Sequence, residues 1–173
     1  MGEGSRRRQE RASAVRHMIR REWKPVSQAK RYFISVDEVT PLDVGSEEGF
    51  QGVDSRLVIS DQTMGSERSC LFRVVFPKGA YHGPHWHTKS DELLYALRGQ
   101  AIQWIDGVEY TMTAGTAMLI PQNTIHWMRN DGEEDFEVIG IYPDAPNFDE
   151  TDQHVSDDWE AYDFSPRTAG KRS

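Results

Sequence analysis

The chain has 173 residues with a formal net charge of −8, and 37% of its residues are hydrophobic. This length provides for one domain with a hydrophobic core and is too short for two ordinary domains. The single cysteine, Cys70, excludes an intramolecular disulfide, and no apolar run is long enough for a signal sequence or a membrane span, so we expect a cytoplasmic protein with no membrane partner.

Residues 1–31 form a basic arm with ten Lys or Arg against three Asp or Glu, whereas the rest of the chain has 10 against 25. The acidic remainder argues against nucleic-acid binding by the main domain, because such binding depends on basic side chains that neutralise phosphates. Between Ser13 and Trp23 apolar side chains recur at helical intervals and Pro25 blocks continuation, which predicts one short amphipathic helix. Met18 is an alternative start of the protein, in which case the arm would be absent from it.

From residue 56 onward the sequence changes to short β-rich runs, whereas residues 40–55 have the glycine and proline content of a loop. The runs are 56–60, 69–76, 84–88, 91–98, 100–105, 108–112, 116–120, 125–129 and 136–142. Strands at this close spacing predict a sandwich or a barrel. Asp106-Gly107 and Asp131-Gly132 predict tight hairpin turns, because glycine tolerates a positive φ.

Residues 151–173 form an irregular acidic tail that contains Trp159, Tyr162 and Phe164. These three side chains are too apolar for a fully solvated tail, so we expect them to dock on the main domain while the acidic side chains face water. Residues 166–173 are predicted to be disordered.

Three histidines and one glutamate have the spacing of metal ligands. His85 and His87 are two residues apart, which places both imidazoles on the same face of a strand, and Glu92 and His126 follow along the chain. This donor set suits one divalent ion, with Fe(II) or Mn(II) favoured, Zn(II), Ni(II) or Co(II) as alternatives, and Ca(II) or Cu(I) disfavoured. An octahedral ion would keep two positions for water, a chelating substrate, or substrate and O₂.

These residues lie within two motifs that resemble those of the cupin superfamily. The first is Gly79-x5-His85-Trp86-His87-x4-Glu92-x6-Gly99, and the second is Gly115-x5-Pro121-x-Asn123-x2-His126-x3-Asn130. Asn123 stands where the family usually has glycine, and Asn also tolerates the left-handed turn conformation.

The resemblance covers residues 56–142 and implies an all-β fold, a double-stranded β-helix of the jelly-roll class with the metal near one mouth of the barrel. We therefore assign residues 32–150 to a cupin barrel, with a motif core at 79–130, between the N-terminal arm with its short helix and the acidic tail. The resemblance implies no single function, because similar barrels support many different activities.

Candidate proton carriers near the site are His82, Tyr81 and Glu109, of which the first two are our candidate catalytic residues. Arg73 lies in mid-strand between apolar residues, where it would either bind a substrate carboxylate from inside the barrel or form an ion pair on the outer face. Met128 shares the face of His126 by strand alternation, whereas Trp127 points the other way.

The aromatic side chains near the motifs, which include Trp104, favour an organic substrate. Trp104 and Met128 join Arg73 as candidate substrate-binding residues. Core packing alone would explain most of the aromatic side chains. A dioxygenase-type oxidoreductase is the first hypothesis. A redox-neutral lyase, decarboxylase or isomerase is the second, and a non-catalytic ligand-binding module is the third. The exposed edges of a small barrel and the amphipathic arm predict a homodimer.

Overall fold

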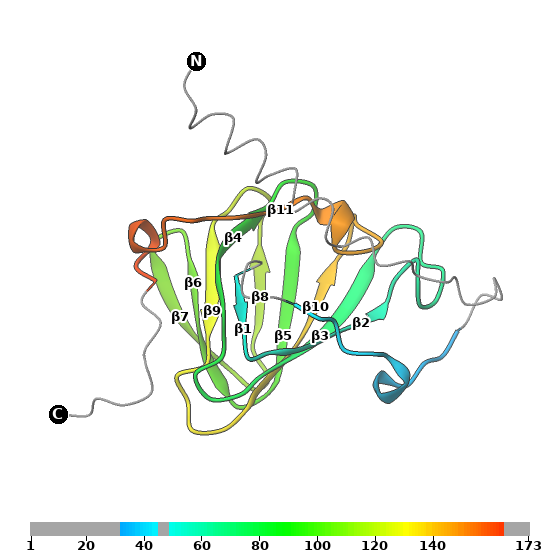
Figure 1. Ribbon diagram of the computed structural model, residues 1–173, viewed down its shortest axis with the longest axis horizontal. Coiled ribbons are helices and arrows are strands. Elements are labelled where there is room, and N and C mark those ends of the chain that lie inside the picture. The colour runs from blue at the N-terminus through cyan, green and yellow to red at the C-terminus, as the bar shows by residue number, and fades with distance from the viewer. Residues whose placement is uncertain (1–31, 45–48, 165–173) are drawn as a thin grey trace, which may run out of the picture.

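The computed structural model describes residues 32–44 and 49–164. The predicted helix over 13–23 and the predicted disorder at 166–173 lie outside these residues. In the described part the protein is nearly all β, with two antiparallel sheets that face each other (Figure 1). Within the same residues, no helix is both long and apolar enough to cross a membrane.

Sheet A has six strands and sheet B has five. Sheet A runs in the order β1 (Phe50–Gln51), β4 (Tyr81–His87), β9 (His126–Arg129), β6 (Gln100–Ile105) and β7 (Val108–Thr113), and β11 (Gln153–Val155) also pairs with β4. Sheet B runs in the order β2 (Asp54–Ile59), β3 (Cys70–Phe76), β10 (Phe136–Tyr142), β5 (Glu92–Arg98) and β8 (Ala117–Ile120). The described residues also contain three short 3₁₀ helices, which are η1 (Val36–Glu38), η3 (Asp149–Thr151) and η4 (Glu160–Tyr162). The predicted jelly-roll fold is confirmed.

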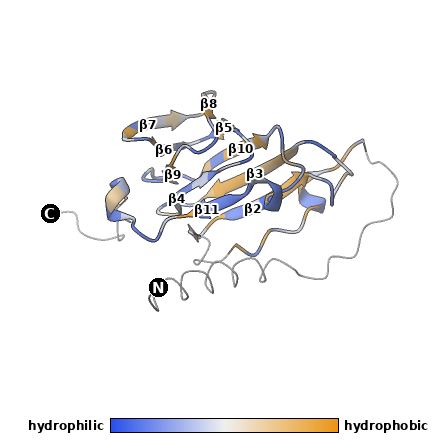
Figure 2. Cartoon of the chain, turned by 90° about the horizontal axis from the view of Figure 1, so that it is seen from above, coloured by the Kyte–Doolittle hydropathy of each residue, from blue (hydrophilic) through white to orange (hydrophobic). Residues whose placement is uncertain are grey.

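The space between the sheets is filled by the side chains that strand alternation turns inward. Along β3 the buried residues are Cys70, Phe72, Val74 and Phe76, and much of this strand is coloured as hydrophobic in Figure 2. Every second residue of β10 is likewise buried. Each such apolar side chain contributes about 1.5–3 kcal/mol when fully buried. This core holds the strands that carry the predicted metal ligands.

The nine predicted strands are present, with ends that differ by at most three residues. The structure adds β1 within the predicted loop and β11 within the predicted tail, both paired with β4. Asp106-Gly107 forms the expected turn between β6 and β7, with φ values of 45° and 91°. Asn123 has a φ of 61°, as the motif requires.

The predicted hairpin at Asp131-Gly132 is wrong, because β9 and β10 belong to different sheets. The connection is held instead by the buried side chain of Asn130. Its Nδ2 donates to the carbonyl oxygens of Phe76 at 2.7 Å and Glu134 at 2.8 Å, and its Oδ1 accepts from the Gly132 amide at 2.8 Å. Asn130 therefore provides hydrogen-bond partners for backbone groups of the loop that crosses from sheet A to sheet B.

The aromatic residues of the tail pack on the outer face of sheet A, as predicted. Phe164 is 3% exposed and forms a cluster with Tyr81, Trp104 and Trp127. The indole nitrogen of Trp127 donates to the carbonyl oxygen of Tyr162 at 2.8 Å. The tail thus covers the face of sheet A that points away from the barrel interior.

Candidate metal centre

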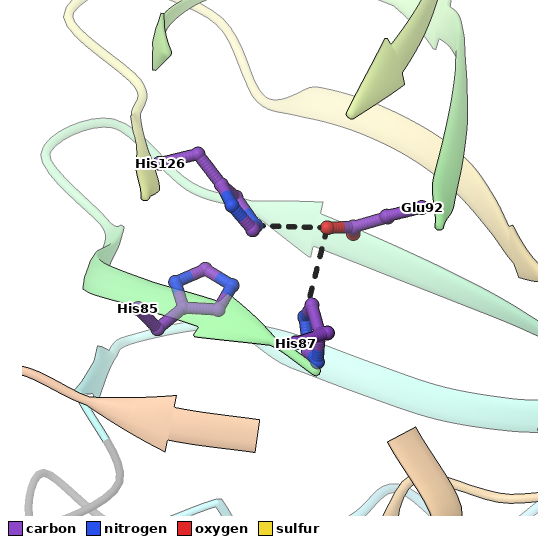
Figure 3. A group of neighbouring side chains, drawn as sticks. All are labelled: His85, His87, Glu92 and His126. Atoms are coloured by element: carbon purple, nitrogen blue, oxygen red, sulfur yellow. Dashed lines mark ion pairs between the residues drawn. The ribbon is translucent and has the colours of Figure 1, made fainter. Parts of the chain in front are cut away.

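The structure brings His85, His87, Glu92 and His126 together inside the barrel (Figure 3). His85 and His87 come from β4, His126 begins β9 directly opposite His85, and Glu92 begins β5 of the other sheet. One donor atom from each residue can be chosen so that all four lie within 4.8 Å of one another, and all four residues are buried. These four side chains are the set that the motif spacing predicted.

Backbone carbonyls determine which nitrogen of two of these histidines is free. His85 Nδ1 lies 2.8 Å from the Gly83 oxygen, and His126 Nδ1 lies 2.9 Å from the Thr124 oxygen. A carbonyl oxygen can only accept, so each Nδ1 must carry the proton and donate it. In both neutral imidazoles Nε2 is left with a lone pair, the form in which histidine binds a metal.

The donor atoms themselves fit a cation. His126 Nε2 lies 2.9 Å from Glu92 Oε2, and His87 Nε2 lies 3.8 Å from the same oxygen. In the described part of the chain, Glu92 Oε2 and His126 Nε2 are buried without a hydrogen-bond partner. Such orphan atoms are rare and destabilising, and two lone pairs this close repel each other unless a proton or a metal ion lies between them. One carboxylate and three neutral imidazoles give a net charge of −1, which suits a dication.

The protein environment keeps these ligands in their metal-binding protonation states. Burial, reinforced by the neighbouring histidines, lowers the pKa of His85 well below its ordinary value. Burial likewise lowers the pKa of His87 to about 4, although Glu92 opposes this shift. Burial raises the pKa of Glu92, but His126 and His87 outweigh it and leave that pKa lowered. At neutral pH His85 and His87 are therefore neutral imidazoles beside a carboxylate, as metal binding requires.

We expect the metal-free protein to lose stability as the pH falls below neutrality. His87 takes up a proton near pH 6.5 in the unfolded chain and only near pH 4 in the fold, so between these values protons favour the unfolded state. Each histidine of this kind adds a slope of about 1.4 kcal/mol per pH unit to the free energy of unfolding, and His82 and His85 have pKa values shifted in the same direction. Urea unfolding at a series of pH values measures this slope. His87→Gln should make it shallower, and a stability that stays constant down to about pH 5 would contradict the assignment.

His82, a predicted catalytic residue, adjoins the site. The pairing of β4 with β9 shifts register between His82 and His85, which turns His82 inward although it is three residues from His85. Its ring stacks on His85 with centroids 3.6 Å apart, and Phe50 of β1 stacks on its other side at 3.6 Å. Burial and the neighbouring histidines lower the pKa of His82 well below its ordinary value, so this imidazole is neutral.

Tyr81, the other predicted catalytic residue, does not reach the site. It points to the outer face of sheet A, where its ring contacts Phe164 and Trp159 at centroid distances of 5.0 and 5.7 Å. The register shift between His82 and His85 explains the correction, because it turns His82 inward and leaves the adjacent Tyr81 facing outward. Glu109 lies exposed on β7.

Two of the three predicted substrate-binding residues also face away from the site. Arg73 lies on the outer face of sheet B, where its Nε donates to Glu137 Oε1 at 2.7 Å, so the ion-pair alternative holds. Trp104 stacks on Trp127 on the outer face of sheet A, with centroids 6.1 Å apart. Met128 is buried in the interior core and pairs in register with His82, so it remains on the side of the ligands.

Tyr142 is a site residue that the sequence analysis missed. It ends β10, is 4% exposed, and its hydroxyl lies 3.0 Å from His87 Nε2. Burial, with the Glu92 carboxylate adding to it, raises the pKa of Tyr142 well above its ordinary value, so the phenol keeps its proton and can donate it. Alternation along 136–142 would have turned this ring inward, but only the pairing of β10 with β5 places it beside the ligands.

Comparison with known proteins supports the same fold. Residues 72–142 match the Cupin_2 family model, described as a cupin domain. The polyketide synthase CurC of Streptomyces cyaneus is 25% identical over 127 residues, which cover 70% of this chain and 82% of the relative. Quercetin 2,3-dioxygenase of Bacillus subtilis is 34% identical over 65 residues, which cover 38% of this chain and 19% of that enzyme. The crystal structure of a predicted oxalate decarboxylase from Thermotoga maritima aligns with a TM-score of 0.58 and 23% identity, covering 65% of this chain and 98% of that one.

Proposed function

We propose that this protein, whose residues 72–142 form a cupin domain, is a metal-dependent enzyme that acts on a small organic molecule. We further propose that the reaction is a dioxygenase-type oxidation and that the metal is Fe(II) or Mn(II). The observation that carries the proposal is the buried set of three histidines and one glutamate, in which Glu92 Oε2 and His126 Nε2 have no hydrogen-bond partner.

His85, His87, Glu92 and His126 would hold the metal through three Nε2 atoms and one carboxylate. Fe(II) or Mn(II) bound there would supply a redox centre with positions left for a chelating substrate and for O₂. The surrounding residues have distinct roles. Met128 and the His82 ring line the ligand side with apolar and aromatic surface, and the Tyr142 hydroxyl is a hydrogen-bond donor beside the ligands.

The positions of two of the three candidate proton carriers favour oxidation over a redox-neutral reaction. A lyase or isomerase needs a general acid or base at the substrate. Tyr81 and Glu109, two of the three carriers considered, lie away from the ligands. The similarity to quercetin 2,3-dioxygenase supports oxidation, and with the similarity to a polyketide synthase it supports an oxygenated aromatic substrate.

A redox-neutral lyase, decarboxylase or isomerase is the second candidate, and the position of His82 favours it. This neutral imidazole stacks directly on a ligand histidine, where it could take a proton from a bound substrate. The fold shared with the predicted oxalate decarboxylase is compatible with either reaction.

Dependence on O₂ separates these reactions. Protein purified without oxygen is loaded with Fe(II), Mn(II), Zn(II) or Ni(II) and supplied with small phenols, diketones and hydroxy acids. We expect turnover with Fe(II) or Mn(II), with O₂ consumed in step with substrate, and no turnover under anaerobic conditions. The matched control is Glu92→Gln, which keeps the shape of the side chain and removes its charge.

The other outcomes of this experiment are equally informative. Undiminished turnover without O₂ would overturn the oxidation and favour the redox-neutral reaction with His82 as base. Tight binding of a compound without turnover under any condition would indicate the third hypothesis, a ligand-binding barrel.

A further inference from the structure

The segment that follows the matched cupin domain is built into the metal centre. Residues 149–155, here called the C-terminal clamp, comprise η3 and β11. β11 pairs with the strand that carries two of the ligands, with Gln153 opposite His87 and Val155 opposite His85. The backbone amides of Thr88 and Lys89 donate to the carbonyl oxygens of Asp152 at 3.4 Å and Thr151 at 3.2 Å. The clamp thus fastens the end of β4.

One clamp side chain contacts a ligand directly. Thr151 is fully buried, and its hydroxyl oxygen lies 3.0 Å from His87 Nδ1. The same hydroxyl donates to the carbonyl oxygen of Phe148 at 2.8 Å. A threonine hydroxyl has a single proton, and here the carbonyl takes it. The contact with His87 therefore requires that Nδ1 carries the imidazole proton and that Thr151 accepts it.

We propose that Thr151 is a positioning residue of the metal centre, which fixes the tautomer and the ring orientation of His87. With the proton held on Nδ1, the lone pair of His87 is on Nε2, which faces Glu92 and the Tyr142 hydroxyl. Thr151 does for His87 what the carbonyls of Gly83 and Thr124 do for the other two histidines. This inference rests on the proposed metal site and extends it to a residue outside 72–142.

Without the hydroxyl, His87 would lose the acceptor that holds its proton on Nδ1. The imidazole proton could move to Nε2, which would then be unable to bind a metal, and the ring could rotate about its side-chain bonds. Removing a hydrogen-bond partner of a ligand histidine typically lowers metal affinity about 10–100-fold. The rest of the clamp would keep its backbone bonds to β4, so the loss would be specific to His87.

The test compares two threonines at the contact between the clamp and the end of β4, Thr151 and Thr88. Thr151→Val keeps the shape of the side chain and removes the acceptor, whereas Thr151→Ser keeps the hydroxyl. Thr88→Val is the matched control, because the Thr88 hydroxyl donates at 2.7 Å to Asp152 of the same clamp and not to a ligand histidine. Mn(II) affinity is measured by competition with a chelator. We expect a loss of about 10–100-fold in Thr151→Val, recovery in Thr151→Ser, and little change in Thr88→Val.

A second measurement needs no metal. Nitrogen-15 NMR of the metal-free wild-type protein distinguishes the two neutral tautomers of His87, and we expect the proton on Nδ1. A proton on Nε2 would overturn the proposal even if Thr151→Val failed to fold, and so would equal Mn(II) affinity in Thr151→Val and the wild type. Failure of the wild type to bind any divalent metal would instead refute the proposed function, while a proton on Nε2 in the NMR spectrum would still overturn the role of Thr151.

Discussion

Replacing His126 with alanine is expected to lower the affinity for the divalent metal by at least about 100-fold and to abolish metal-dependent turnover. The substitution removes one of four donors from a buried site that no other described His, Cys, Asp or Glu side chain joins. It also leaves Glu92 Oε2, already without a hydrogen-bond partner, facing an empty space. Elemental analysis of protein purified without added metal, followed by chelator competition, measures the effect.

His154→Ala is the control for this prediction. His154 lies on β11, partly exposed, where its ring stacks on Trp86 and its Nε2 lies 3.4 Å from Asp152 Oδ2. Losing this histidine removes an imidazole close to the site without removing a donor, so the metal content should equal that of the wild type. Similar metal content in His126→Ala and the wild type would show that the four residues are not the metal site.

Three of the four candidate ligands were predictable from short-range rules. Two residues of separation on a strand place His85 and His87 on one face, and the turn after β4 returns the chain to Glu92. The position of His126 rests instead on the family resemblance, since the β4–β9 pairing that sets it opposite His85 joins residues 41 positions apart. The inward direction of Met128 and the outward direction of Trp127 also follow from simple alternation.

In–out alternation of side chains failed as a guide where a register shift between paired strands interrupted it. The register shift between His82 and His85 turns His82 inward, so Tyr81 faces outward. Gly83-Pro84 is the local signal that could have marked this shift, because glycine and proline inside a strand often mark a bulge. β1 and β11 have two and three residues, too few for a periodic pattern, and both form only because β4 offers them a free edge. The contacts of Tyr142 and Thr151 with His87 depend on such long-range pairing. The homodimer and the cytoplasmic location remain predictions.

Replacing Phe164 with alanine is expected to destabilise the fold by about 3–4 kcal/mol, as large-to-small substitutions of buried aromatic residues do. Phe164 lies 22 residues beyond the end of β10 and only 3% of it is exposed. Its ring contacts Tyr81, Trp159 and Trp127 at centroid distances of 5.0, 5.0 and 5.3 Å. The substitution would open a cavity beneath the tail and admit water to the outer face of sheet A.

Urea unfolding measures the change in free energy, and tryptophan fluorescence reports whether the indoles beneath the tail become solvated. Leu119→Ala is the control, because this residue of β8 is 56% exposed and its loss should change stability by no more than about 0.5 kcal/mol. Mn(II) affinity should be retained in folded Phe164→Ala, since the ligands lie on the opposite face of β4 and β9 from the tail cluster. A destabilisation below about 1 kcal/mol with unchanged fluorescence would mean that the tail does not stabilise the barrel by packing on it.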